Sequence, residues 1–353
     1  MSGRDTIEQF TYDLPPERIA QEPVDRRSGA RLLDASDWCA VDRRVDDLPT
    51  LVGAGDLLVL NTTKVMPSRL LLQKASGGAA EVLLLDEEPD QDGECAGQYG
   101  GLGSGEAFYR ALVRPGRRLR AGTVLQVEGR DAVVVESEAL GEERSRLVRV
   151  LDARIVEQFG QVALPPYIHV PLADPDRYQT VYATSPGSVA APTAGLHLTE
   201  ELLQQCVRSG ASIALLDLSI GIGTFRPVTA HKPDEHVMHP ERYRVPAATM
   251  SMCSRARRVI AVGTSTLRAL ETVALTGELS GTTELFVHGE HDFKVVDLLF
   301  TNFHQPRSSL LMLVDSFYGP GWRDLYSWAL RSSYRFLSFG DATLLGRGKG
   351  TRP

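Results

Sequence analysis

The sequence predicts an α/β protein that carries a small inserted β-barrel. Beyond about residue 153, strand-like segments alternate with helical ones, the pattern of a largely parallel sheet flanked by helices. Between residues 69 and 151, roughly six short strand-like segments follow one another without a helix, which is typical of a barrel. The apolar segment 57–60 precedes them but resembles the α/β strands. We therefore expect a mixed or parallel-sheet α/β catalytic domain of residues 1–64 and 155–353, and an inserted barrel of residues 65–154.

The expected barrel strands are apolar or β-branched, and turn residues such as Pro115-Gly116 and Glu128-Gly129 separate them. They fall at residues 69–74, 80–85, 111–113, 123–127, 132–136 and 146–151. Residues 86–106 are rich in glycine and acidic side chains and lack an apolar period, so we expect a surface loop there.

The expected α/β elements begin with a helix that Thr199 can cap and that Gly210 ends. They continue with a strand at 213–218, a helix at 247–258, a strand at 259–262 and a helix at 264–275 that Gly277 closes. This alternation of helices and strands supports a parallel sheet.

The composition is that of a globular protein large enough for two domains. Of the 353 residues, 42% are hydrophobic and 24% are charged. No segment approaches the roughly 18 apolar residues of a membrane span, and residues 1–10 lack the apolar core of a secretory signal. We therefore expect a cytoplasmic protein without a membrane partner, and we favour a monomer. The four cysteines are scattered, which argues against a disulfide framework, a zinc site or a redox motif.

The net charge of −7 is not the overall signature of a nucleic-acid-binding protein. Binding of RNA would therefore need a local basic patch. One candidate is Arg117, Arg118 and Arg120 with the neighbouring Arg114, and a second is Arg255, Arg257 and Arg258. Solvated surface charge is the plainer interpretation of both.

Small and polar residues gather in five clusters in the second half of the chain. The clusters are Pro192-Thr-Ala-Gly-Leu-His197, Gly221-Ile-Gly223-Thr-Phe-Arg226, Gly263-Thr-Ser-Thr-Leu-Arg268 with Glu271, Thr301-Asn-Phe-His304, and Ser338-Phe-Gly-Asp341. The first precedes a helix, and the others follow apolar, strand-like stretches. Since ligands of α/β sheets bind beyond the carboxyl ends of the strands, the clusters indicate a binding site. A metal is not expected, because the His236–His239 spacing is short and no third ligand is evident.

Together these segments resemble S-adenosylmethionine:tRNA ribosyltransferase-isomerase, an enzyme family of queuosine biosynthesis. The resemblance covers nearly the whole chain and is weakest at residues 75–160. Its motifs are Tyr12-Asp-Leu-Pro, Ile19-Ala-Gln-Glu-Pro23, Asp56-Leu-Leu-Val-Leu-Asn-Thr-Thr-Lys-Val65, Leu164-Pro-Pro-Tyr-Ile168, Arg177-Tyr-Gln-Thr-Val-Tyr-Ala183, Gly187-Ser-Val-Ala-Ala-Pro-Thr-Ala-Gly-Leu-His197, Gly223-Thr-Phe-Arg-Pro-Val228, Glu235-His-Val-Met-His-Pro-Glu241, Thr301-Asn-Phe-His304, Tyr334-Arg-Phe336 and Gly340-Asp-Ala342.

The resemblance implies an α/β catalytic domain with an inserted barrel, and it implies the reaction. The ribosyl part of S-adenosylmethionine moves onto the aminomethyl group of a 7-deazaguanine in the tRNA anticodon and isomerises to epoxyqueuosine, while adenine and methionine leave. S-adenosylmethionine is the donor substrate, tRNA is the partner, and no metal or further cofactor is implied. The sulfonium acidifies the C5′ proton, so a general base is needed.

The matching motifs supply the candidate site residues. We expect the catalytic residues to be His197, His239, Glu241 and Arg226. The candidate substrate-binding residues are Lys64, Arg69, Tyr178, Pro192, Thr193, Ala194, Gly195, Gly221, Gly223, Thr224, Phe225, Gly263, Thr264, Ser265, Arg268, Glu271, Asn302, Phe303, His304 and Asp341.

Two kinds of role remain to be divided among these residues. Arg226 offers a planar fork for the methionine carboxylate or an acceptor phosphate. The candidates for the C5′ base are His197, His239, Glu241 and Asp341. We favour His197, because its unperturbed pKa suits proton transfer and small residues precede it, with His239 and Glu241 as a supporting pair. A histidine that only bonds the backbone of its turn is the alternative.

Ser219-Ile-Gly221 stands where the family usually carries His-Val-Gly. One alternative is therefore a paralogue with the same sulfonium chemistry on a small-molecule amine. Another is a tRNA-binding protein that has lost catalysis. Release of adenine that depends on precursor tRNA separates the three.

Overall fold

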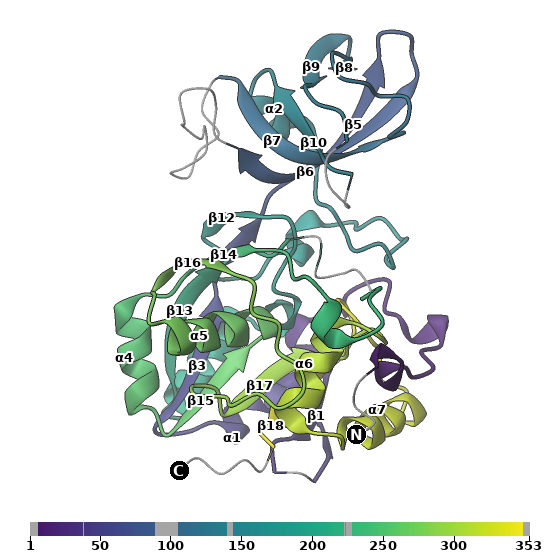
Figure 1. Ribbon diagram of the computed structural model, residues 1–353. Coiled ribbons are helices and arrows are strands. Elements are labelled where there is room, and N and C mark those ends of the chain that lie inside the picture. The colour runs from purple at the N-terminus through teal and green to yellow at the C-terminus, as the bar shows by residue number, and fades with distance from the viewer. Residues whose placement is uncertain are drawn as a thin grey trace. The chain divides into compact units, whose positions relative to one another are not determined.

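The larger part of the protein is built on one nine-stranded sheet. The computed structural model describes residues 6–37, 39–88, 105–139, 144–221, 223 and 228–348, and its sheet has the order β16-β14-β13-β3-β15-β17-β18-β1-β2 (Figure 1). The strands are β1 (Arg31–Ala35), β2 (Val41–Arg44), β3 (Asp56–Asn61), β13 (Ser212–Leu218), β14 (Glu241–Arg244), β15 (Arg258–Val262), β16 (Ser280–Thr283), β17 (Leu298–Asn302) and β18 (Ala342–Gly346).

Four neighbouring strands in the middle of this sheet run parallel. β13 pairs with β3, β3 with β15, and β15 with β17. β3 and β17 are buried along their whole length and are mostly apolar, as a sheet covered on both faces requires. Because parallel strands end at the same edge, Asn61, Leu218, Val262 and Asn302 all lie at the carboxyl edge of the sheet.

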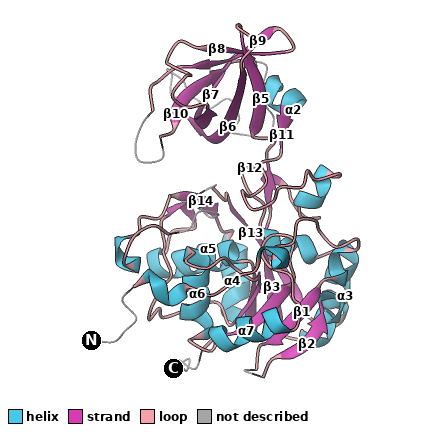
Figure 2. Ribbon diagram, turned by 90° about the vertical axis from the view of Figure 1, so that its right-hand side faces the viewer, coloured by secondary structure: helices cyan, strands magenta, loops and turns pink. Residues whose placement is uncertain are grey.

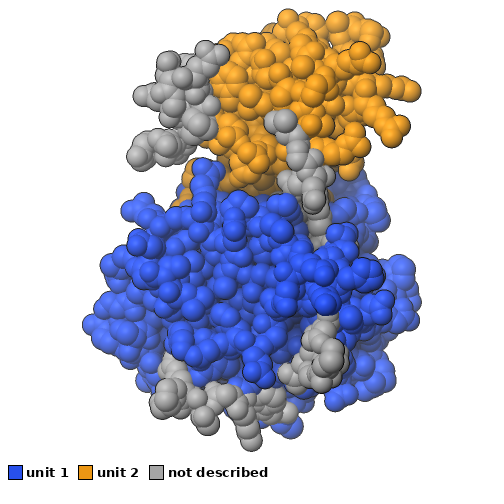
Figure 3. Space-filling model, viewed as in Figure 1, with its two compact units in different colours: residues 1–64, 165–184, 191–353 blue, residues 65–164, 185–190 orange. Residues whose placement is uncertain are grey.

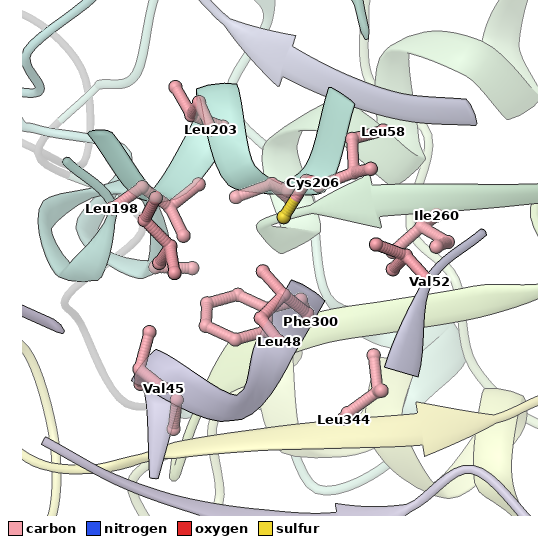
Figure 4. Close-up of a cluster of buried hydrophobic side chains, with 14 of the residues drawn as sticks. Val45, Leu48, Val52, Leu58, Leu198, Leu203, Cys206, Ile260, Phe300 and Leu344 are labelled. Carbon is pink, nitrogen blue, oxygen red and sulfur yellow. The ribbon is translucent and has the colours of Figure 1, made fainter. Parts of the chain in front are cut away.

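Helices cover both faces of the sheet. They are α1 (Leu48–Leu51), α3 (Glu200–Arg208), α4 (Ala247–Arg255), α5 (Thr264–Thr276), α6 (Ser309–Tyr318) and α7 (Trp322–Arg331). Figure 2 shows α4, α5 and α6 on the side of the sheet opposite α3. Between α1, α3 and the sheet lies an apolar core in which Leu58, Ile260 and Phe300 meet Leu48 and Cys206 (Figure 4).

Three residues predicted from the sequence to mark helix ends, Thr199, Gly210 and Gly277, are confirmed. The Thr199 hydroxyl accepts the backbone N–H of Leu202 at 3.1 Å and so caps α3. Gly210 follows α3 with φ of +101°, and Gly277 ends α5 with φ of +77°. A side chain at either position would strain this left-handed backbone.

The rest of the chain forms a closed antiparallel barrel with the strand order β5-β6-β7-β10-β9-β8, completed by pairing of β8 with β5. Its elements are β5 (Arg69–Lys74), β6 (Ala79–Glu88), β7 (Ala107–Arg114), β8 (Val124–Val127), β9 (Arg130–Val135), β10 (Arg146–Val150), α2 (Arg154–Phe159) and β11 (Gly160–Gln161), which pairs with β5. Residues of β7 alternate between buried and less buried positions, so every second side chain fills the barrel. The predicted fold class, α/β with an inserted barrel, is confirmed.

The chain divides into an α/β unit and a barrel unit, which Figure 3 colours separately. The α/β unit holds residues 1–64, 165–184 and 191–353, and the barrel unit holds residues 65–164 and 185–190. The sequence interpretation set the second boundary at residues 154 and 155. The barrel unit continues to Leu164 because α2 and β11 pack on β5, and two short strands, β4 (Thr63–Val65) and β12 (Ser185–Ser188), lie where the chain passes between the units.

No helix within the described ranges combines the length and the apolar character needed to cross a bilayer. Three free cysteines are described: Cys39 is exposed, whereas Cys206 and Cys253 are buried. Burial raises the pKa of each buried thiol to about 11, so both are unreactive core residues near neutral pH. Cys95 lies outside the described residues.

Candidate active site

A cavity in the α/β unit lies at the carboxyl edge of the parallel strands. The segments that follow β13, β15 and β17 all line it. The residues predicted from the sequence that line it are Pro192, Thr193, Ala194, Glu241, Gly263, Thr264, Ser265, Arg268, Asn302, Phe303 and His304. Four of the five predicted clusters, at 192–197, 263–268, 301–304 and 338–341, therefore contribute to one cavity. The clusters after β15 and β17 meet there because parallel strands end at the same edge of the sheet.

The cavity is also lined by residues that the sequence interpretation did not select. They are Tyr167, Ala191, Ile220, Thr301, Gln305, Ser308, Leu310, Leu337 and Ser338. Tyr167, Ala191, Ile220, Thr301 and Ser338 stand inside segments that were noted, so their position in those segments was the available signal. Leu310 and Leu337 carried none, because an aliphatic side chain that lines a cavity follows the same pattern as one in the core.

Asn61 fixes the geometry of the carboxyl edge. Its Nδ2 donates to the backbone carbonyl of Leu218 at 2.9 Å and to Ser265 Oγ at 3.2 Å. Its Oδ1 accepts the N–H groups of Leu218 at 3.0 Å and Thr63 at 3.1 Å. One buried amide thus joins the ends of β3 and β13 to the first turn of α5, and this explains why an asparagine ends β3.

Asn302 connects the cavity wall to a buried histidine. Its Oδ1 accepts the Thr193 hydroxyl at 3.1 Å, and its Nδ2 lies 3.0 Å from His197 Nε2. Burial, with smaller effects of Arg335 and Arg27, lowers the pKa of His197 to about 3. The neutral ring can therefore accept the amide hydrogen at Nε2. His197 is not among the lining residues, so the geometry favours a positioning role for it.

His304 is the histidine that lines the cavity. Its Nε2 lies 3.1 Å from Thr301 Oγ1. Its backbone is held on both sides, since the N–H donates to Tyr326 Oη at 3.2 Å and the carbonyl accepts Tyr12 Oη at 2.5 Å. Burial lowers the pKa of His304 to about 3, so the ring is neutral near pH 7. The motif that begins at Tyr12 thus contributes to the cavity wall from the other end of the chain.

Glu241 and Arg268 form a buried ion pair that lines the cavity. Their exposed fractions are 6% and 4%. Glu241 Oε1 also accepts the Gly221 N–H at 3.1 Å, and Arg268 Nε donates to the carbonyl of Leu285 at 2.9 Å. The pair therefore ties the segment after β13 to α5, and a buried pair of this kind tolerates loss of neither member.

The segment between Tyr334 and Asp341 forms another wall of the cavity. The Asp341 carboxylate accepts the backbone N–H groups of Arg31 at 3.0 Å and Arg335 at 2.8 Å. Ser338 Oγ lies 2.7 Å from Tyr167 Oη, and both residues line the cavity. Asp341 itself is not a lining residue, and its carboxylate shapes the loop that carries Ser338.

Three further predicted residues are buried but do not line the cavity. The Glu271 carboxylate accepts the backbone N–H groups of residues 294–296 at 2.8 to 3.0 Å. Tyr178 is fully buried and makes an edge contact with Phe339. A Cβ on Gly195 would come within 2.1 Å of Tyr182 Oη, so a glycine is required there by packing.

The remaining predicted residues are separate from the lining set. Gly223 lies against the exposed His239, because a Cβ on this glycine would approach His239 Cδ2 within 2.4 Å. Lys64 is exposed in β4, and Arg69 belongs to the barrel unit, where it pairs with Glu81 at 2.9 Å. Thr224, Phe225 and Arg226 lie outside the described residues.

Two further charged features of the sequence are the possible metal ligands and the second basic patch. Within the ranges described, no group of three or more His, Cys, Asp or Glu side chains is arranged to hold a metal ion. Arg257 and Arg258 pair with the buried Asp56 at 2.9 and 2.6 Å. Two of the three arginines of the second basic patch are therefore held by an internal carboxylate of the α/β unit.

Fold and cavity together define an α/β protein with a polar ligand site at a carboxyl sheet edge and an inserted barrel. The family described as "Queuosine biosynthesis protein" matches residues 7–345, and the chain belongs to this family. A relative from Thermosynechococcus vestitus is 43% identical over 96% of both chains. One from Thermotoga maritima is 42% identical over 96% of this chain and 99% of its own. Both relatives bear the name S-adenosylmethionine:tRNA ribosyltransferase-isomerase.

A solved structure agrees with this assignment. The crystal structure of S-adenosylmethionine tRNA ribosyltransferase from Thermotoga maritima superposes with a TM-score of 0.52 and 33% sequence identity, covering 95% of this chain and 99% of that one. The departures noted in the sequence, Ser219 among them, therefore occur within a member of the family that matches its relatives over nearly their whole length. A divergent paralogue is not favoured.

Proposed function

We propose that this protein is an S-adenosylmethionine-dependent ribosyltransferase-isomerase that acts on tRNA. It transfers the ribosyl part of the donor to the aminomethyl group of 7-aminomethyl-7-deazaguanine in the anticodon and isomerises it, giving epoxyqueuosine, adenine and methionine. Action on tRNA implies a cytoplasmic enzyme. A monomer, and catalysis without a metal, remain predictions.

The observation that carries this proposal is the full-length relationship to enzymes of that name, together with a cavity built from the related motifs. The cavity combines small residues, which let a ligand approach the backbone, with buried amide, imidazole and carboxylate groups. Such a site suits a donor that carries an adenosine, a sulfonium and an amino-acid tail.

The C5′ proton acceptor is best sought among the groups that line the cavity. Glu241 is held by Arg268, and Asp341 is occupied by two backbone N–H groups. His304 is the imidazole that lines the cavity, so its ring can reach a bound ligand, and its lowered pKa keeps it unprotonated at neutral pH while making it a weak base. We therefore assign proton abstraction to His304, and we assign His197 the task of orienting Asn302.

The function is tested by release of adenine from S-adenosylmethionine in the presence of precursor tRNA. We expect release with tRNA that carries 7-aminomethyl-7-deazaguanine and none with tRNA that carries guanine at the same position. Release with the free aminomethyl base and not with tRNA would instead support the small-molecule alternative. Binding of tRNA without any release of adenine would support the non-catalytic one.

The proton acceptor is tested by exchange of solvent deuterium into C5′ of bound S-adenosylmethionine. His304→Gln should abolish exchange while the donor still binds, since glutamine can still bond Thr301 but is no base. His197→Gln should slow exchange without abolishing it, because only the orientation of Asn302 is lost. Normal exchange in His304→Gln, with exchange lost in His197→Gln, would return the role to His197.

A further inference from the structure

Helix α5 begins at the cavity without a side-chain cap. Its N-cap residue is Gly263, with φ of +91°, and the following Thr264 and Ser265 line the cavity. The first N–H groups of a helix have no partner within it, and no side chain in the described part of the chain caps them. These donors, on a helix of 13 residues, favour a negative group in the cavity.

Arg268 supplies a second, independent indication of an anionic ligand. It lies one turn into α5, lines the cavity and is 4% exposed. Its Nε and Nη1 are occupied by Leu285 and Glu241, but its Nη2 is buried with no hydrogen-bond partner among the described residues. A buried guanidinium N–H without an acceptor costs free energy, so an acceptor from a bound ligand is expected there.

Glu241 places a negative charge in this corner of the cavity, beside the positive charge of Arg268. It lines the same cavity, and its Oε2 bonds Arg268 while its Oε1 accepts the Gly221 N–H. A carboxylate ligand alone would meet repulsion from Glu241. A ligand that carries an ammonium and a carboxylate on one carbon would match both members of the pair.

We propose that the start of α5, Arg268 and Glu241 bind the amino-acid end of the sulfonium donor. The ligand carboxylate meets Arg268 and the first N–H groups of α5, and the ligand ammonium faces Glu241. The inference rests on the proposed function, because it names the part of that donor which this corner holds. It also leaves the nucleoside end for the Asn302 and His304 side of the cavity.

The test compares two donors that differ only in the carboxylate. Equilibrium binding of S-adenosylmethionine and of decarboxylated S-adenosylmethionine is measured on the intact protein. The wild type should bind S-adenosylmethionine about 10- to 100-fold more tightly, the range for one charge-assisted contact. Arg268→Met should remove that preference by weakening S-adenosylmethionine alone. Arg331→Met, at the exposed end of α7, is the matched control and should change neither affinity.

Two further variants show whether a loss of binding in Arg268→Met comes from the missing contact or from misfolding. Arg268→Lys keeps a positive charge beside Glu241 and should lose part of the preference. Arg268→Met combined with Glu241→Gln leaves no buried charge unpaired and should lose all of it. Equal affinity of the wild type for both donors, or equal loss of both in Arg268→Met, would overturn the inference. Failure of the wild type to bind S-adenosylmethionine at all would instead overturn the proposed function.

Discussion

The two units use their interiors differently. The barrel interior is filled by aliphatic residues and Tyr109, and among its described residues the one buried charged side chain is Arg146. Arg146 donates to backbone carbonyls, Gly116 among them at 2.6 Å. The carboxyl edge of the α/β sheet instead buries amide, imidazole, carboxylate and guanidinium groups around a cavity.

This contrast separates stability from chemistry. A substitution inside the barrel should act on the free energy of unfolding, because only packing is lost there. A substitution at the carboxyl edge should act mainly on binding and turnover, because the groups there are held ready for a ligand. In the barrel, we expect only the exposed arginines to act on function, by binding RNA.

The largest expected effect is on stability, in the barrel. Leu125 is fully buried in the barrel core, and Leu125→Ala should lower the free energy of unfolding by about 2–5 kcal/mol. Urea unfolding measures the loss. The KM for S-adenosylmethionine should stay at its wild-type value in the folded fraction, and a raised KM would break the proposed separation.

The next effect is on turnover, at the carboxyl edge. Asn302→Ala should lower kcat/KM about 100-fold, as loss of one preorganised donor does. Asn302→Asp keeps the shape but loses the Nδ2 donor to His197, so it tests the amide itself. Wild-type kinetics in Asn302→Asp would mean that the amide does not contribute to the reaction.

The buried histidines should make the α/β unit sensitive to acid. Burial lowers the pKa of His304 from 6.5 to about 3, so between these values the unfolded chain binds a proton that the folded protein does not. Stability is therefore lost as the pH falls below 6.5, with a slope of up to about 1.4 kcal/mol per pH unit. The free energy of unfolding is measured between pH 5 and 6.5 in the wild type and in His304→Gln. The variant should lack the contribution of His304 to this slope. An unchanged slope would contradict a neutral buried His304.

The smallest effect concerns the surface of the barrel. Arg117, Arg118 and Arg120 are exposed on the connection between β7 and β8, as a phosphate-binding patch requires. Replacing all three by glutamine should weaken tRNA binding and reduce its dependence on salt by up to about one phosphate contact each. Arg255→Gln, at the end of α4, is the control. An unaltered salt dependence in the triple variant would place the RNA contact elsewhere.

Much of the fold was predictable, because its signals are local. β5 begins and ends where the sequence predicts, and Thr199 and Gly277 mark helix ends by their own chemistry. The predicted helix 247–258 ends at Arg255, because β15 begins at Arg258 and pairs with β3. Pairing across the sheet is not local, so the order of β17, β18 and β1 could not be derived from any single stretch of sequence.

The site was predictable as a set of clusters but not as a set of roles. Strand ends in a parallel sheet converge, which brought Ser265 and Asn302 into one cavity, and Thr193 joins them from the segment before α3 by its bond to Asn302. Whether a histidine faces the cavity or the residue behind it depends on side-chain direction, which separates His304 from His197. Glu271 and Asp341 accept backbone N–H groups instead of lining the cavity. Their motifs therefore shape loops as well as bind ligands.

Pairing of β1 with β18 has a consequence for synthesis of the chain. The Thr343 hydroxyl donates to the carbonyl of Leu33, which lies 310 positions earlier in the chain. β1 therefore cannot complete its pairing until β18, the last strand, has been synthesised. A nascent chain on the ribosome can complete the barrel strands long before that, while β1 and β3 remain without their final neighbours. Stalling or truncation before β18 would leave β1 and β17 as open sheet edges, the kind of surface that chaperones bind and that aggregates form from.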